Sequence, residues 1–135
     1  MTAGRPTVLF LCIHNAGRSQ MALGWFQHLA GDAATAYSGG SEPAATVNAV
    51  AADAMAEVGI DITANIPQRW SDAHLAEADV VVTMGCGETC PYVPGTHYED
   101  WLIDDPAGQD LENVRRIRDD IGQRVSRLLA QLTSS

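Results

Sequence analysis

The sequence contains no lysine, so its eight basic residues are all arginines, set against 17 acidic residues and giving a net charge of −9. This balance excludes the broad basic surface of a typical nucleic-acid-binding protein. The nearest thing to a basic patch is Arg115, Arg116 and Arg118, which share a predicted helix with Asp119 and Asp120 and are better explained as a solvated face. We therefore expect no nucleic-acid partner. An anion would have to be bound by local geometry, against the overall field.

Long apolar runs are also missing. None approaches the roughly 20 residues that a membrane-spanning helix needs, and the polar residues before the first apolar run are too few for a signal peptide. We expect a cytoplasmic protein with no membrane partner. The length of 135 residues predicts a single domain over residues 1–135.

Cysteine is sparse, with Cys12, Cys86 and Cys90 only. An odd count in a protein expected in the cytoplasm argues against a framework of structural disulfides. Three residues separate Cys86 from Cys90, and no second Cys/His pair lies at zinc-finger spacing, so we expect no metal.

Apolar runs and helical periodicities alternate along the chain. Strands are predicted at 7–11, 35–38, 78–84 and 97–102, and helices at 19–29, from a cap at Thr46 or Asn48 to about Val58, at 71–77 and, after an Asp110 cap, at 111–132. The first helix should bury Met21, Ala22, Trp25, Phe26 and Leu29. This alternation predicts an α/β fold with a parallel sheet and helices on both faces.

In such sheets ligands bind beyond the carboxyl ends of the strands. Cys12 follows the first predicted strand, Cys86 the third, and Asp105 the last. We expect these three residues to converge at one edge of the sheet.

The segment Cys12-Ile13-His14-Asn15-Ala16-Gly17-Arg18-Ser19 joins a strand to a helix. Loop amides and a helix N-terminus attract a tetrahedral oxyanion and favour the thiolate form of a nearby cysteine. Arg18 offers a bidentate fork, Gly17 allows close backbone approach, Asn15 tolerates a left-handed backbone, and Ser19 can donate to the Cys12 thiolate. These residues leave phosphate and arsenate equally suitable as ligands.

Three further features concern chemistry at this site. Asp105 can exchange a proton with a leaving group, although an aspartate before proline also serves in ordinary turns. Cys86 and Cys90 are either inert loop thiols or, as we favour, the later members of a relay that passes oxidation from Cys12 to Cys86 and then to Cys90. His14 should only line the rim of the loop.

The stretch from Cys12 through Ser19 to Gln20-Met21-Ala22 closely resembles the anion loop of the low-molecular-weight tyrosine phosphatase family, and its Ser-Gln-Met-Ala ending resembles the arsenate reductase branch. Further similar segments are Tyr37–Pro43, Val58–Ile62, Val82–Cys86 and Trp101–Ala107. The resemblance implies a four-stranded parallel sheet flanked by helices on both faces.

The resemblance also implies a mechanism. Cys12 would attack arsenate held by Arg18 and the loop, and Asp105 would assist departure of hydroxide or water. Cys86 would then attack Cys12 and release arsenite, and Cys90 would attack Cys86. No cofactor is bound, and a thioredoxin-like partner would reduce the final disulfide. Asn15 and Ser19 match the pair that organises the loop.

Some features depart from this family pattern. The thioredoxin-coupled branch has a longer separation than the three residues between Cys86 and Cys90, and Leu23 stands where some members use an acidic residue to bind potassium. A cousin branch instead uses mycothiol and mycoredoxin.

Hydrolysis of phosphotyrosine remains an alternative, although Ala107 and Gly108 replace the aromatic residues usual after Asp-Pro. A non-enzymatic oxyanion or redox sensor would need an output surface, which the sequence does not offer.

Overall fold

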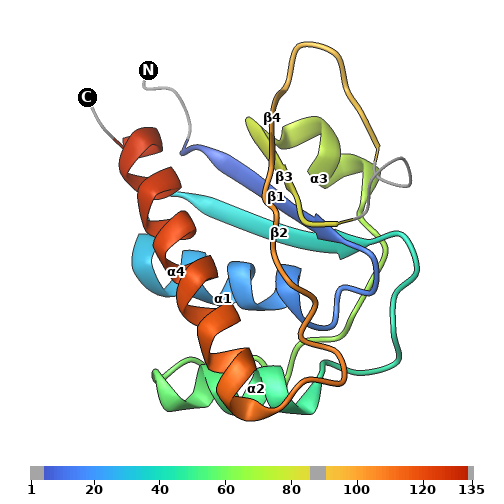
Figure 1. Ribbon diagram of the computed structural model, residues 1–135. Helices are drawn as coiled ribbons and strands as arrows, with labels where there is room; N and C mark the ends of the chain where they lie inside the picture. The colour runs from blue at the N-terminus through green and yellow to red at the C-terminus, as the bar shows by residue number, and fades with distance from the viewer. Residues whose placement is uncertain (1–4, 86–90, 134–135) are drawn as a thin grey trace.

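The computed structural model describes residues 5–85 and 91–133. Within these residues, four strands and four helices alternate in part (Figure 1). In order they are β1 Thr7–Cys12, α1 Arg18–Ala30, β2 Thr35–Gly40, α2 Ala49–Glu57, α3 Asp72–Glu77, β3 Val80–Thr83, β4 His97–Asp100 and α4 Leu111–Thr133.

The strands form one sheet in the order β2-β1-β3-β4, and every neighbouring pair is parallel. Cys12 lies opposite Gly40 of β2, and Leu11 lies opposite Thr83 of β3. The predicted four-stranded parallel sheet is therefore confirmed. Because β1 is central, the loop that follows Cys12 emerges in the middle of the sheet's carboxyl edge.

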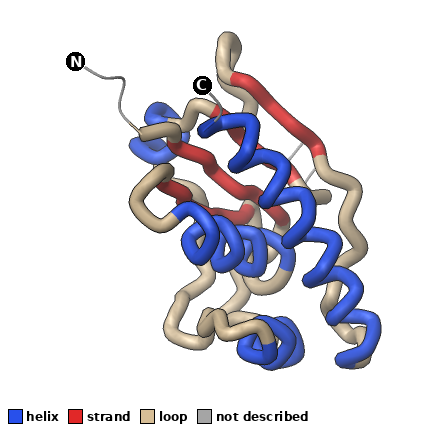
Figure 2. The backbone as a smooth tube through the Cα atoms, turned by 90° about the vertical axis from the view of Figure 1, so that its left-hand side faces the viewer, coloured by secondary structure: helices blue, strands red, loops and turns tan. Residues whose placement is uncertain are grey.

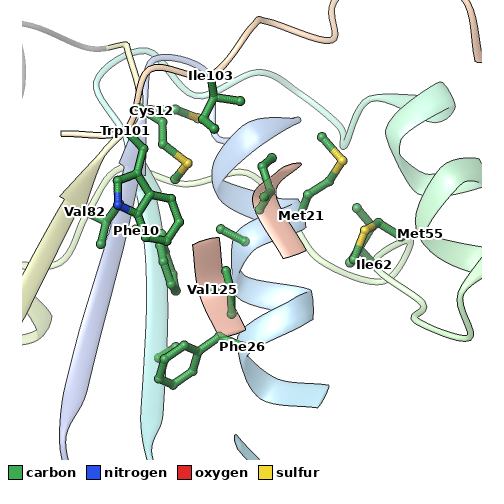
Figure 3. Packing of buried hydrophobic residues seen from close by; sticks show 14 of the residues in the cluster. Phe10, Cys12, Met21, Phe26, Met55, Ile62, Val82, Trp101, Ile103 and Val125 are labelled. Atoms are coloured by element: carbon green, nitrogen blue, oxygen red, sulfur yellow. The ribbon is translucent and has the colours of Figure 1, made fainter. Parts of the chain in front are cut away.

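Helices cover both faces of the sheet, as predicted, but unequally. The alternation along β1 turns Val8 and Phe10 toward a large core shared with α1, α2 and α4, and turns Leu9 and Leu11 toward a smaller cluster that includes Leu75 of α3. Figure 2 shows the long α4 crossing the same side as α1 and α2. Figure 3 shows residues of the large core, in which Phe10 meets Phe26 edge-on at 5.7 Å between ring centroids. This packing fixes α1 against β1 and with it the loop between them.

The ends of the helices follow the expected local chemistry. Gly31 ends α1 with a φ of 53°, and Asn48 caps α2 by accepting the amide hydrogen of Ala51 at 2.9 Å. Asp110 precedes α4 and accepts from the amide of Asn113 at 2.9 Å. The predicted caps at Asn48 and Asp110 are confirmed, and Asn48 rather than Thr46 begins α2.

Two expectations about side chains are wrong. Arg118 is not part of a solvated face: it is 8% exposed, and its Nη1 donates to the carbonyl of Ala54 and to Glu57, both at 2.9 Å. It therefore ties α4 to α2. Leu29 was expected in the core but is 44% exposed, since it lies on the outer side of α1.

The second strand is longer than predicted and includes Gly39 and Gly40, expected as a loop. Both glycines pair with β1 in regions with no room for a side chain. A Cβ on Gly39 would overlap the backbone of Trp70, and one on Gly40 would overlap the carbonyl of Ile13. Close backbone approach, rather than a turn, accounts for them. Among the described residues, no helix is long and apolar enough to cross a membrane.

Candidate active site

Cys12 ends β1 and is almost fully buried, at 2% exposure. Arg18 is the first residue of α1, after the loop that follows Cys12. The cap of α1 is Gly17, which contributes no side-chain hydrogen bond. The first amide groups of α1 are thus left without a side-chain cap, which gives this end of the helix the character of an anion site.

The loop between Cys12 and Arg18 is held from outside by its carbonyl groups. Those of Ile13, His14 and Ala16 accept amide hydrogens from Glu42, Ala44 and Asn48 at 2.8, 2.9 and 2.8 Å. In a trans peptide the N–H points opposite to the carbonyl of the same unit. With these carbonyls turned outward, the amides of the same peptide units face the inside of the loop, where an oxyanion would accept from them.

Asn15 and Ser19 lock the interior of the loop beside the thiol. Asn15 is fully buried and is the one described non-glycine residue with positive φ, at 50°. Its Nδ2 donates to Ser19 Oγ at 2.7 Å, and Ser19 Oγ lies 2.9 Å from Cys12 Sγ. Because the serine oxygen already accepts from Asn15, its own hydrogen is available to the sulfur, an arrangement that stabilises a thiolate.

Arg18 is held in place from three sides. Its Nη1 lies 3.4 Å from the carbonyl of Ile103, and its Nη2 lies 3.7 Å from Asp105 Oδ2. Gly85, with a φ of 90°, packs so closely that a Cβ there would overlap Nη1. The guanidinium is thus almost buried yet fixed beside the loop. Asp105, half exposed, accepts from the amide of Ala107 at 3.0 Å, which holds its carboxylate over the site.

These groups enclose a small depression of about 30 Å³ of space open to water-sized molecules. On that measure a single water needs about 10–15 Å³, so the space suits a compact tetrahedral ion. Pro106 covers one side and packs so tightly on Gly17 that a Cβ at Gly17 would overlap it. The described residues that line the depression include no Phe, Tyr or Trp; they are Cys12, His14, Ala16, Gly17, Arg18, Asn48, Asp105, Pro106 and Ala107.

The structure thus brings together Cys12 and Arg18, which belong to one strand–loop–helix segment, and Asp105, which follows the last strand. His14 lies at the rim, where its Nδ1 donates to the carbonyl of Glu42 at 3.0 Å. Cys86 and Cys90 lie outside the described residues.

Sequence reasoning missed two kinds of residue at this site. Asn48 was considered only as a helix cap, yet it also lines the depression and its amide holds Ala16. Gln20 and Asn65 were assigned no role, although Gln20 donates to Asn15 and Asn65 donates to Gln20. A polar glutamine directly before the apolar face of α1 is the one signal that pointed to them.

Comparison with known proteins agrees with this geometry. The model of the family described as low molecular weight phosphotyrosine protein phosphatase matches residues 7–135. The chain belongs to this family. It is an enzyme, and the predicted resemblance to this family is confirmed.

Three relatives illustrate the match. An arsenate reductase of Bacillus cereus (strain Q1) is 44% identical over 128 residues, 91% of this chain and 93% of that protein. Arsenate reductase 2 of Staphylococcus saprophyticus is 39% identical over 124 residues, covering 90% and 94%. A solved structure, described as a thioredoxin-dependent arsenate reductase of Corynebacterium glutamicum, superposes with a TM-score of 0.84 at 36% identity. This chain is covered to 98% there but spans only 64% of that longer chain.

Proposed function

We propose that this protein reduces arsenate to arsenite, with Cys12 as the nucleophile. The observation that carries the proposal is the depression around Cys12, Arg18 and Asp105, which suits a bare oxyanion and which no aromatic side chain lines within residues 5–85 and 91–133. The names of the relatives at about 40% identity support the same substrate.

In the first step the Cys12 thiolate attacks arsenic while the inward-facing amides and Arg18 bind the oxygens. A sulfur–arsenic bond forms and one arsenic–oxygen bond breaks. Asp105, held 3.7 Å from Arg18, donates the proton that lets the oxygen leave as water. Arsenic stays pentavalent in this adduct, and no electrons have yet been transferred.

Reduction occurs in the second step. The Cys86 thiolate attacks Cys12 Sγ, the sulfur–sulfur bond forms, and the sulfur–arsenic pair of electrons remains on arsenic, which leaves as arsenite. Cys90 then attacks Cys86, freeing the Cys12 thiolate and moving the disulfide to Cys86–Cys90. A thioredoxin-like dithiol supplies the two electrons that reopen it. This relay rests on the three cysteines of the sequence and on the family resemblance.

Arsenate-dependent oxidation of NADPH in the presence of thioredoxin and thioredoxin reductase tests the proposal. Wild type should turn over repeatedly, whereas Cys12→Ser, Cys86→Ser and Cys90→Ser should each lose multiple turnover. Full activity of the last two variants with mycothiol and mycoredoxin would replace the relay by external thiol attack. Efficient phosphotyrosine hydrolysis without arsenate reduction would assign the chain to the phosphatases instead.

A further inference from the structure

A line of amide side chains leads from Cys12 toward the surface. Beyond the contacts of Ser19 with Cys12 and Asn15, Gln20 Nε2 donates to Asn15 Oδ1 at 3.2 Å, and Asn65 Nδ2 donates to Gln20 Oε1 at 3.0 Å. Asn15, Ser19 and Gln20 are each at most 2% exposed, and Asn65 is half-buried. The outermost link thus joins residues 45 positions apart in the sequence.

The direction of donation along this line is fixed by a backbone group. The amide N–H of Gln68 donates to Asn15 Oδ1 at 3.0 Å, and a backbone N–H can only donate. The oxygen of Asn15 therefore faces Gln68, and its nitrogen faces Ser19. Gln20 must then present its nitrogen to that oxygen, which turns its own oxygen toward the donor of Asn65.

Each hydrogen bond from Asn65 through Gln20 and Asn15 to Ser19 consequently donates inward. Hydrogen bonds linked head to tail polarise one another, and the effect is larger in a buried, low-dielectric environment. At the inner end Ser19 Oγ lies 2.9 Å from Cys12 Sγ, and its hydroxyl must be the donor when the sulfur is a thiolate. Since a thiolate only accepts, the whole line favours the charged form of Cys12 over the neutral thiol.

We propose that Gln20 and Asn65 are positioning residues that stabilise the Cys12 thiolate through Asn15 and Ser19. Neither is among the residues that line the anion depression, so each acts through the line and not on the substrate. The inference rests on the proposed function only in taking the Cys12 thiolate as the reacting group.

Two substitutions each break one hydrogen bond of the line, because they replace a donor nitrogen by an oxygen, without changing side-chain size. Asn65→Asp places an oxygen where Gln20 needs a donor, and Gln20→Glu does the same opposite Asn15. The matched control is Gln68→Glu, which adds the same charge on an exposed side chain and keeps the backbone N–H. All are made in the Cys86→Ser/Cys90→Ser background, where Cys12 is the sole thiol.

The measurement is the rate of iodoacetamide alkylation of Cys12 against pH, with thermal unfolding in parallel. Asn65→Asp should slow alkylation on the rising part of the profile about threefold and Gln20→Glu about tenfold, because the second breaks a link nearer the sulfur. The profile should move to higher pH in both, beyond any movement in Gln68→Glu. If Gln20→Glu does not fold, Asn65→Ala, which removes the outer donor without adding charge, takes its place.

Profiles that coincide with that of Gln68→Glu would overturn the inference, and lowered unfolding temperatures alone would mean that the amides only support the loop. This result is separable from failure of the proposed function. If Cys12 of the wild type is alkylated like an ordinary thiol, Cys12 is not an activated nucleophile and the proposed function fails. If wild-type Cys12 is alkylated already at lower pH than an ordinary thiol and the variants do not change its profile, only the roles of Gln20 and Asn65 are refuted.

Discussion

Gly85 offers the sharpest test of how the anion site is built. Its φ of 90° is unfavourable for any residue with a side chain, and a Cβ there would overlap Nη1 of Arg18. Arg18 has little freedom to move aside, since it is 8% exposed and lies against the Ile103 carbonyl. Gly85→Ala should therefore disturb both the backbone and the guanidinium.

Gly95 separates these two effects. Its φ is 91°, nearly that of Gly85, but nothing lies within 4 Å of a Cβ added there. Each alanine should lower the free energy of unfolding by about 1–2 kcal/mol through backbone strain. Only Gly85→Ala should also weaken anion binding. Loss of one hydrogen bond from Arg18 to a charged oxygen is worth about 1.5–3 kcal/mol, which corresponds to roughly a 10- to 100-fold rise in Kd.

The assay is calorimetric titration with inorganic phosphate, which probes the anion site without needing the later cysteines, supported by the KM for arsenate. Urea unfolding of the two variants checks that their losses of stability match. The reasoning is refuted if Gly85→Ala binds phosphate as tightly as Gly95→Ala, because Arg18 would then not depend on the absence of a side chain at position 85.

Two further outcomes follow from described contacts. The hydrogen bond from Arg115, and then that from Arg118, lowers the pKa of Glu57 from 4.5 to about 2. Its stabilising contribution should be complete above pH 4.5 and lost as pH falls toward 2, so the urea midpoints of wild type and Glu57→Gln should differ at neutral pH and converge near pH 2. Gly17→Ala should displace Pro106 and the adjoining Asp105, the proton donor in the proposed mechanism. In steady-state kinetics kcat for arsenate should fall about 10- to 100-fold, and an unchanged kcat would show that this close packing is not needed.

Much of the fold could be predicted because burial is periodic in the sequence. The apolar positions of α4, spaced by three or four residues from Leu111 to Leu132, and the β-branched run Val80–Val82 each match one kind of element. The parallel direction of the strands follows from the alternation of strands and helices, whereas the strand order is known only from the structure. Gly39 and Gly40 were misjudged because glycine marks close backbone approach as well as turns, and only their neighbours in the structure, Trp70 and the carbonyl of Ile13, distinguish the two.

Periodicity reports which side chains are buried, but not which polar partners they meet. Arg118 looked like a surface charge because the acceptors that allow its burial, Glu57 and the Ala54 carbonyl, belong to α2, more than 60 positions away. The same limit hid the link between Gln20 and Asn65. By contrast Cys12 and Arg18 could be identified because both belong to one continuous strand–loop–helix segment.

The depression around Cys12 favours a bare oxyanion over an aryl phosphate, but the groups that bind the oxyanion serve hydrolysis and reduction alike. Inward-facing amides, Arg18 and Asp105 would serve equally for attack on phosphorus or arsenic, since both steps replace one oxygen of a tetrahedral ion by sulfur. The difference lies in the next step. A thiol that attacks Cys12 Sγ can leave its electron pair on arsenic(V), whereas phosphorus(V) is not reduced by thiols and its adduct must be hydrolysed. A hydrolase has no use for Cys86 and Cys90, so these two residues are the part of the sequence that hydrolysis leaves unexplained, and reduction gives each of them a defined bond to form.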